Sequence, residues 1–257
     1  MHENQRFKNQ GFKNLGNTCY INTVLQCLRH QRHFVKTLRD IECNTFEHFL
    51  NLLYDDSTPQ DLQRFVLYLM VKQMHHGHQG DAHEFFIRMV DLFYTEHKDT
   101  YNPFEGTFTT RLFCTCGFET TNQEPFTCLS VTPKQNKSIQ QLVEGIEEVE
   151  HIDMTCVCGR KLQKQTNISS YPKSFVVHIK RFNNQNKKIK SNVSLAFLPK
   201  YRLTSTCNHL GSAANGHYTA TVNKGRRRFY MCSDDTVVPV PKPTQSQTCY
   251  LLFYEQT

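Results

Sequence analysis

Cys19 is the residue of this sequence best placed to act as a nucleophile. It lies in GFKNLGNTCYINTVLQCL, residues 11–28, immediately before a helical stripe of apolar residues. A thiol at a helix N-terminus meets the positive end of the helix dipole and unpaired N–H groups, which favour the thiolate. Asn14 could donate its amide to an oxygen that becomes negative during acyl transfer. The segment also fits a buried core cysteine at a helix start.

A base for this thiol is expected near the carboxyl end. His217 lies in NGHYTATV, residues 215–222, after a loop of small residues and at the head of a predicted strand. A histidine with a pKa near neutrality can accept the thiol proton and later protonate a leaving amine. The chain has 13 histidines, and one at a strand start is usually structural. Those of the sequence HHGH, residues 75–78, predict a polar loop rather than a metal site.

A third group would be needed to orient the imidazole. Ser233, Asp234 and Asp235 follow a predicted strand in RRFYMCSDDTVVPV, residues 227–240. A hairpin of this strand with HYTATV would bring them beside His217. The alternative is a turn cluster that precedes another strand.

Four of the eleven cysteines form two short pairs, CTCG at 114–117 and CVCG at 156–159. Cysteines that close together rarely bond each other, and four thiolates suit a tetrahedral structural zinc site. The predicted ligands are Cys114, Cys116, Cys156 and Cys158. The alternative is a finger that holds no metal and keeps these cysteines as small apolar residues. The other cysteines, apart from Cys19, are expected to be core thiols.

These residues need a scaffold, and its elements are visible in the pattern. Apolar stripes predict helices within residues 21–28, 62–70 and 85–93, and a further one over 139–149 that starts with a capping box at Ser138. Helices first and strands later predict an α+β fold. The predicted strands, apart from those already given, cover 107–113, 126–131, 174–182, 200–207 and 249–255.

Composition narrows the class of protein. The chain has 257 residues, 38% hydrophobic and 12% aromatic, which argues against disorder. No apolar run is long enough to cross a bilayer, and the first ten residues are too polar for a secretory signal. The net charge of +7 is spread out, and its densest patches, 187–190 and 226–228, are short, so no nucleic acid is expected. Clustered thiols fit a reducing intracellular compartment, cytoplasm or nucleus.

Taken together, these segments resemble the ubiquitin-specific protease family of deubiquitinating enzymes. The resemblance runs from about residue 10 to 256 and includes several motifs in the family's order. It implies a papain-like fold with thumb, palm and zinc-ribbon fingers, and a ubiquitin tail threaded between thumb and palm. The motifs are the cysteine box (11–28), QGDAHEFF (79–86) as the QQD-x-x-E-F-L element, FVVHIKRF (175–182) as the strand that closes the fingers, the histidine box HLGSAANGHYTATV (209–222) and the terminal strand YLLFYE (250–255).

By this resemblance Cys19 is the nucleophile, His217 the base and Asn14 part of the oxyanion hole. The family usually orients the histidine with Asp or Asn. Counting back from the two following valines places either Ser233 or Asp234 at that position. We favour Asp234, because a serine stabilises imidazolium only through a neutral hydrogen bond.

The resemblance also indicates residues that meet the substrate. Asp81 and Glu84 stand at a helix start as a capping arrangement, and the same acidic positions would receive the basic Leu-Arg-Gly-Gly tail of ubiquitin. His209 and the loop 211–216, which ends at Gly216, would cover the tail near the scissile bond. Tyr218, next to the histidine, is expected at the substrate as well. Both cysteine pairs are one residue shorter than the family's usual Cys-x-x-Cys.

The expected protein is a single catalytic domain over 1–257, with a helical thumb (11–103), fingers (104–185) and a region that is mainly palm (186–257). It would be a monomeric cysteine-type ubiquitinyl hydrolase that cleaves after ubiquitin's C-terminal glycine, in polyubiquitin or ubiquitinated proteins. Its zinc would be structural. The alternatives are a protease for a ubiquitin-like modifier, an inactive ubiquitin-binding module and, less favoured, a zinc-ribbon binder of nucleic acid.

Overall fold

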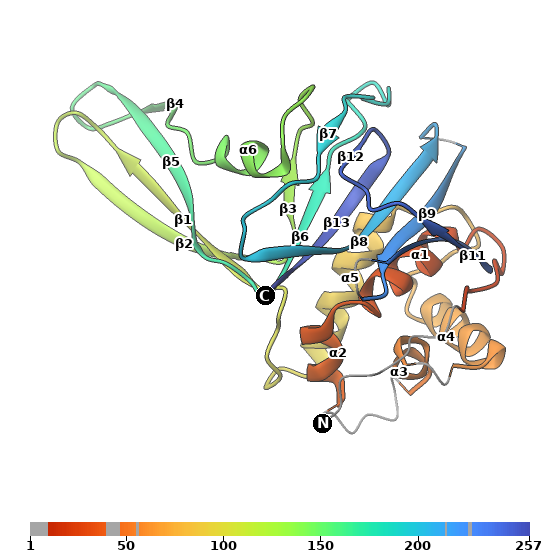
Figure 1. Cartoon of the computed structure of the whole chain (residues 1–257). Helices are drawn as coiled ribbons and strands as arrows, with labels where there is room; N and C mark the ends of the chain where they lie inside the picture. Colours follow the sequence, from red (N-terminus) through yellow and green to blue (C-terminus); the bar gives the residue numbers. More distant parts are fainter. Residues whose placement is uncertain (1–9, 40–46, 55–56, 214, 226–227) are drawn as a thin grey trace.

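The computed structural model describes residues 10–39, 47–54, 57–213, 215–225 and 228–257. Predictions for the first nine residues, Cys43, position 214 of the covering loop and the basic pair 226–227 lie outside this part. Helices dominate the first hundred residues and strands follow, so the predicted α+β class is confirmed (Figure 1).

Five helices lie among the described residues of the N-terminal region, and the three predicted stripes correspond to α1, α4 and α5. All ten residues of α1 are buried, and this helix packs against β8, β9 and α5. On α4 the stripe is narrower than predicted, because Met70 is 43% exposed. The helices are α1 (Cys19–Leu28), α2 (Arg32–Arg39), α3 (Glu47–Leu53), α4 (Pro59–Val71), α5 (Ala82–Glu96) and, later in the chain, α6 (Ile139–Glu144).

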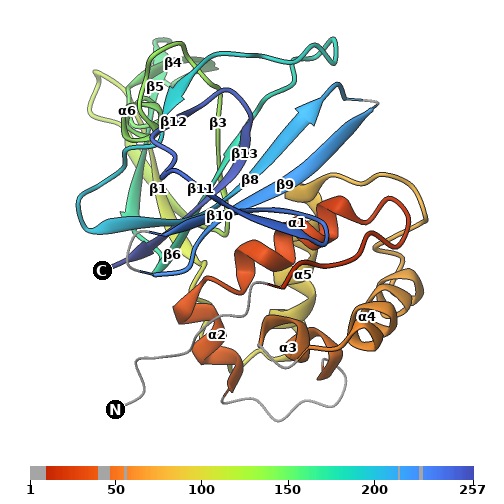
Figure 2. The same cartoon turned by 45° about the vertical axis from the view of Figure 1, so that its right-hand side comes forward.

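A seven-stranded sheet with the order β11-β10-β9-β8-β13-β6-β3 forms the body of the molecule. Helices α1 and α5 pack against one of its faces (Figure 2). The last strand, β13, lies inside the sheet between β8 and β6, so the C-terminal segment is part of the core. The strands are β3 (Leu129–Val131), β6 (Ser174–Ile179), β8 (Tyr201–Gly211), β9 (Gly216–Asn223), β10 (Phe229–Ser233), β11 (Thr236–Val240) and β13 (Cys249–Gln256).

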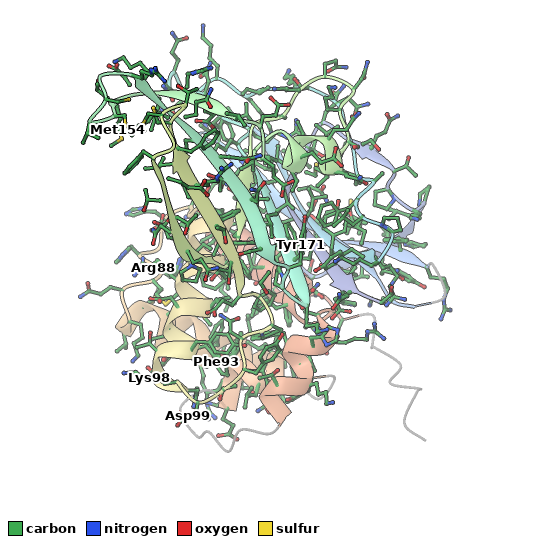
Figure 3. The ribbon with its side chains drawn as sticks, turned by 90° about the vertical axis from the view of Figure 1, so that its left-hand side faces the viewer. Arg88, Phe93, Lys98, Asp99, Met154 and Tyr171 are labelled. Carbon is green, nitrogen blue, oxygen red and sulfur yellow. The ribbon has the colours of Figure 1, made fainter. Side chains whose placement is uncertain are left out.

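A separate antiparallel sheet, ordered β2-β1-β5-β4, projects from the body (Figure 1). It takes only residues between 106 and 170, whereas β6, which we expected to close the fingers, lies within the large sheet. Figure 3 shows Met154 at the far end of this sheet and Phe93 in the helical region. Its strands are β1 (Gly106–Phe113), β2 (Glu119–Phe126), β4 (Glu150–Thr155) and β5 (Lys161–Ser170); a small pair joins β7 (Val193–Ser194) to β12 (Gln245–Ser246).

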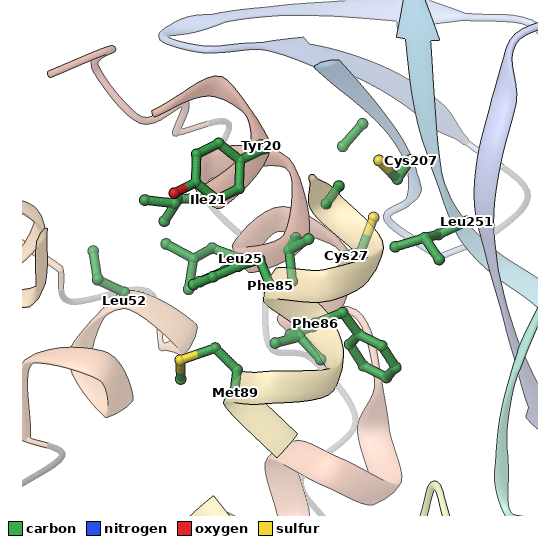
Figure 4. Packing of buried hydrophobic residues seen from close by; sticks show 14 of the residues in the cluster. Tyr20, Ile21, Leu25, Cys27, Leu52, Phe85, Phe86, Met89, Cys207 and Leu251 are labelled. Carbon is green, nitrogen blue, oxygen red and sulfur yellow. The ribbon is translucent and has the colours of Figure 1, made fainter. Parts of the chain in front are cut away.

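The main core lies between α1, α5 and the sheet. Ile21, Leu25 and Phe86 are fully buried there, and Leu251 of β13 packs against the same cluster (Figure 4). Burial of each such side chain stabilises the fold by roughly 1.5–3 kcal/mol. The cluster includes Cys19 at the start of α1, so core packing fixes the helix that carries the candidate nucleophile.

A buried charge fastens the ends of two elements. The guanidinium of the fully buried Arg181 donates to the carbonyl oxygens of Ile189, Ser191, Ser246 and Cys249 at 2.6–3.2 Å. This ties the start of β13 to the segment after β6. A buried polar group is tolerated only when it is hydrogen-bonded in this way.

The sequence patterns mispredicted two elements, the length of α6 and the presence of β2. The helix predicted over 139–149 ends at Glu144, with Gly145 as its C-cap, and Val149 is 47% exposed. Strand β2 was not predicted, because every residue before Phe126 is exposed and no apolar alternation exists. Its pairing with β1 comes from the hairpin register instead.

Candidate functional site

Cys19 is presented by a tight loop at the N-terminus of α1. Gly16 and Asn17 adopt positive φ angles of 98° and 55°, which lets the chain turn sharply into the helix. Thr18 is the N-cap, but its hydroxyl accepts from the Leu15 N–H at 2.9 Å and makes no cap bond to the helix. The first N–H groups of α1 therefore remain available to the sulfur and to a bound anion.

The surroundings of the Cys19 thiol favour its neutral form. Burial is the largest influence and raises its pKa above the ordinary value, although backbone N–H groups of Tyr218, Tyr20 and Cys19 itself act in the opposite direction. The nearby carboxylate of Asp234 raises the pKa further. The expected thiolate preference at the helix start is thus outweighed by loss of solvent. The contact with Tyr218 also places the sulfur beside the residue that follows His217.

His217 and Ser233 meet across a hairpin, as the sequence predicted for this segment. Strands β9 and β10 pair antiparallel, with Cys232 opposite Ala220. Near the end of this pairing, the Nε2 atom of His217 lies 3.0 Å from the hydroxyl oxygen of Ser233. His217 is half-buried, so its ring is fixed on one side and reachable on the other.

The Asp234 carboxylate contacts two asparagine amides and not the His217 imidazole, which was the partner we favoured. Its carboxylate accepts from the Asn14 amide at 3.0 Å and from the Asn22 amide at 2.8 Å. Its backbone oxygen accepts from the Phe12 N–H at 2.9 Å. The side chain is committed to the N-terminal segment and α1, so the geometry places Ser233, not Asp234, against the imidazole of His217.

Asn14 is exposed and doubly anchored. Its side-chain oxygen accepts from the N–H groups of Gly16 at 3.0 Å and Thr18 at 3.3 Å, while its amide nitrogen donates to Asp234. An amide nitrogen has two hydrogens, so one donor remains for an oxyanion. The backbone of the same loop presents Cys19.

Asp81 is saturated by the protein. One carboxylate oxygen caps α5 by accepting from the His83 and Glu84 N–H groups at 2.8 and 2.9 Å. The other accepts from the hydroxyls of Tyr250 and, at 3.5 Å, Tyr218. The capping interpretation describes this geometry, which leaves little of the carboxylate for a basic tail. Glu84, with a side chain 67% exposed and a carboxylate oxygen 3.7 Å from the Arg88 guanidinium, is the more accessible acidic group.

The other predicted substrate residues lie on the β8–β9 hairpin. His209 is buried, and a Cβ atom added to Gly216 would lie 2.1 Å from its Nε2 atom, so only glycine fits there. The Gly216 oxygen accepts from the Gln79 amide at 2.7 Å, which ties the hairpin to the segment before α5. The ring of Tyr218 is buried against His209, so this residue could meet a substrate only through its backbone.

The four paired cysteines converge on one point between two finger hairpins. The Cys114–Cys158 and Cys116–Cys156 sulfur distances are 3.5 and 3.7 Å, and all four sulfurs lie within 4.8 Å of one another. Ligands at about 2.3 Å from a tetrahedral zinc would be separated by about 3.8 Å. The shortened pairs therefore still form a cage of metal-binding size.

Glycine closes each cysteine turn. Gly117, with a φ of 95°, donates its N–H to the Cys114 oxygen at 3.1 Å. Gly159, with a φ of 83°, repeats this with the Cys156 oxygen at 2.8 Å. Two equal turns facing each other explain how a Cys-x-Cys spacing can supply four converging thiolates.

Two residues of this site were missed from sequence. Asn22 lies on the polar side of the α1 stripe and bridges Asp234 to the carbonyl oxygens of Phe12 and Lys13. Gln79 was noticed only as part of a motif. A polar residue three positions after a candidate nucleophile, on an otherwise buried helix, was the available signal for Asn22.

Two cavities of about 550 and 530 Å³ lie away from Cys19 and His217. A channel for a diglycine beside these two residues stays a prediction.

A sequence model described as "Ubiquitin carboxyl-terminal hydrolase" matches residues 10–254, almost the whole chain. The chain belongs to the ubiquitin carboxyl-terminal hydrolase family. It is 27% identical to ubiquitin carboxyl-terminal hydrolase 23 of Arabidopsis thaliana, over 95% of this chain and 35% of that protein. It is 26% identical to ubiquitin carboxyl-terminal hydrolase Usp2 of Drosophila melanogaster, over 96% of this chain and 35% of that protein. It thus spans about a third of these relatives.

Solved structures share the fold of this chain. The SAGA Ubp8/Sgf11/Sus1/Sgf73 DUB module bound to ubiquitin aldehyde contains a chain that superposes with a TM-score of 0.81 and 20% identity. The match covers 100% of this chain and 72% of that chain. Within the described residues, none of the helices has the length and hydropathy of a membrane-spanning segment.

Because burial raises the Cys19 pKa, its alkylation should follow the thiol's own titration. We expect the rate of iodoacetamide addition to Cys19 to rise about tenfold per pH unit from pH 6 to 9, since the thiolate fraction does so below the pKa. The measurement is mass spectrometry of the Cys19 peptide, with the Cys19→Ser variant as control. A rate that is already constant at pH 6 would reveal a thiolate–imidazolium pair and contradict this.

Proposed function

We propose that this chain is a thiol-dependent deubiquitinase that hydrolyses the bond after ubiquitin's C-terminal glycine, usually an isopeptide bond to lysine. The observation that carries the proposal is the closure of the β9–β10 hairpin on the start of α1. It brings together Cys19, the His217–Ser233 pair and the anchored amide of Asn14. Family membership supports the same activity.

The first step is attack of the Cys19 sulfur on the carbonyl carbon. Because burial raises the pKa of the Cys19 thiol, His217 would accept its proton as the new carbon–sulfur bond forms. The hydroxyl of Ser233 holds the imidazole by its Nε2 atom, which leaves Nδ1 to face the thiol. The developing oxyanion is held by the Asn14 amide and the free N–H groups of α1.

The second step returns the proton. The imidazolium of His217 protonates the lysine amine as the carbon–nitrogen bond breaks, and the acyl group remains on Cys19 as a thioester. The neutral imidazole then takes a proton from water, whose oxygen attacks the thioester carbonyl. The carbon–sulfur bond then breaks, the imidazolium of His217 returns its proton to the sulfur, and the free carboxylate leaves.

The substrate tail would lie along the β8–β9 hairpin. Gly216 leaves the backbone without a side chain beside His217, which suits a diglycine. The exposed Glu84 carboxylate would bind the tail's arginine in competition with Arg88, its ion-pair partner at 3.7 Å. We propose ubiquitin, polyubiquitin and ubiquitinated proteins as substrates, acted on by one catalytic domain that works as a monomer. The ten described cysteines are free thiols, which supports a reducing intracellular location.

We propose zinc as the ion of the four-cysteine cage. Cys114, Cys116, Cys156 and Cys158 would hold it, and its role would be structural, because four thiolates fill a tetrahedral site. Bound zinc would tie the β1–β2 turn to the β4–β5 turn. These turns are joined by little else apolar, since the small cluster there has Leu162 as its only buried non-cysteine residue among those described.

The nucleophile is tested by Cys19→Ala. This variant should lose at least about a thousandfold in hydrolysis of a ubiquitin–aminomethylcoumarin amide, since the residue that forms the acyl bond is gone. It should still bind ubiquitin within about threefold of the wild-type Kd, measured by isothermal calorimetry. SUMO and ISG-type conjugates, which the wild type should leave intact, serve as the specificity control. Hydrolysis that persists in Cys19→Ala would show that the nucleophile is another residue.

The two candidate orienting residues should behave differently. Ser233→Ala removes one neutral, partly exposed hydrogen bond to His217 and should lower kcat about three- to tenfold, with at most about 1 kcal/mol lost from the free energy of unfolding. Asp234→Ala releases both Asn14 and Asn22, so it should cost more activity and also about 1–3 kcal/mol of stability. Steady-state kinetics and urea unfolding measure the two effects. Equal losses of stability would contradict the division of roles.

The cage predicts one zinc ion per chain. The double variant Cys116→Ser and Cys158→Ser should lose this zinc, because it removes two of the four thiolates. Atomic emission on purified protein measures the content, and Cys128→Ser, outside the cage, is the matched control. A metal-free wild type with ordered finger hairpins, seen by hydrogen exchange, would rule out the structural zinc site.

A further inference from the structure

Lys188 lies at the end of a tight turn that follows β6. Asn183 organises this turn, because its side-chain oxygen accepts from the N–H groups of Gln185 and Lys187 at 3.0 and 2.9 Å. Asn186 has a φ of 57°, and Phe182 pairs with Lys188 in an antiparallel bridge. The turn reverses the chain and returns Lys188 toward the β8–β9 hairpin.

The Lys188 ammonium has three acceptors, all on that hairpin. Its Nζ atom lies 2.6 Å from the His209 oxygen, 3.1 Å from the Gly211 oxygen and 2.9 Å from the His209 Nδ1 atom. An ammonium group has three hydrogens, so each has a partner. The side chain is half-buried, and burial lowers the pKa of Lys188.

These carbonyl groups lie where the neighbouring strand stops. Strand β13 pairs with β8 only from Cys249, opposite Asn208, and the last bond joins the His209 N–H to the Thr248 oxygen at 2.9 Å. The oxygens of His209 and Gly211 lie past this point. The Lys188 ammonium supplies donors there in place of the absent strand residues.

The capped segment is the one that faces the candidate base. In the β8–β9 register, Leu210 is opposite His217 and Gly211 is opposite Gly216. Lys188 therefore binds β8 on both sides of Leu210, the residue paired with His217. Lys188 is itself held in place, because Arg181 donates to the carbonyl oxygen of Ile189, the next residue along the chain.

The contact also sets the proton of the His209 ring. Lys188 can only donate, so Nδ1 of His209 must accept and the ring hydrogen must sit on Nε2. The His209 pKa is lowered to about 4, mainly by burial and then by the Lys188 charge, so the ring stays neutral. Its Nε2 atom lies against the bare backbone of Gly216.

We propose that Lys188 is a positioning residue for the candidate catalytic site: it holds the open end of the β8–β9 hairpin and fixes His209 as the Nε2–H tautomer. The inference rests on the proposed function for its catalytic part. By this contact His217 and Gly216 keep their places beside Cys19. A misplacement of about 1 Å at a reacting group can cost about 100-fold in rate.

The test compares Lys188→Met with Lys187→Met, the same change at the exposed neighbouring lysine. Two quantities are measured: kcat on the ubiquitin–aminomethylcoumarin amide, and the tautomer of His209 from ring nitrogen shifts in protein carrying ¹⁵N-histidine. The His209→Gln variant assigns the signal. Lys188→Met should lower kcat about 10- to 100-fold and give a mixture of tautomers, while Lys187→Met should change kcat less than twofold and keep Nε2–H.

Two further variants keep the test decisive. Lys188→Arg retains the charge and several donors and should recover part of kcat; if Lys188→Met does not fold, Lys188→Gln is held to the same two criteria. The inference is overturned if either readout in the Lys188 variant matches that of Lys187→Met. If the wild type itself fails to hydrolyse the ubiquitin amide, the proposed function fails, and the tautomer measurement still decides whether Lys188 controls His209.

Discussion

The carboxylate of Asp234 connects the two halves of the candidate site. It receives the amides of Asn14 and Asn22 from one side, while the residue before it, Ser233, contacts His217 on the other. A Cβ atom on Gly11 would lie 2.4 Å from the Asp234 oxygen, so the N-terminal segment can approach this turn only without a side chain. The nucleophile loop and the histidine hairpin are distant in sequence, and this turn joins them in addition to the packing of α1 on β8 and β9.

This arrangement favours a rigid site over a pre-charged one. Burial fixes the position of α1, and it also raises the pKa of Cys19. The sulfur is therefore well placed but less readily ionised. In the proposed mechanism, His217 held by a neutral serine would act as the base, and the anchored Asn14 amide would donate to the developing negative charge. An aspartate at position 233 would stabilise imidazolium more strongly, but it would place a second carboxylate beside Asp234.

The sequence was informative wherever local chemistry and spacing agree. Cys19 before a helical stripe, the hairpin that carries His217 and the paired cysteines were all visible, because each rests on a short-range pattern. The choice between Ser233 and Asp234 as the neighbour of the imidazole could not be made from the sequence, because the two adjacent side chains contact different parts of the fold. The sequence showed Lys188 only as part of a basic patch. Its contact with β8 depends on where β13 starts, far along the chain, so no local pattern could predict it. Polar strands such as β2 were not predicted, because they form through pairing with a neighbouring strand and their composition carries no strand pattern.

The central claim is that His217 acts on the sulfur of Cys19 at the end of a channel for ubiquitin's tail. Reaction with ubiquitin that carries a C-terminal propargylamide, followed by mass mapping of the adduct, tests it most directly. The account predicts one adduct, on Cys19, formed at least about tenfold more slowly in the His217→Ala variant. An adduct on another cysteine, or an unchanged rate without His217, would contradict it.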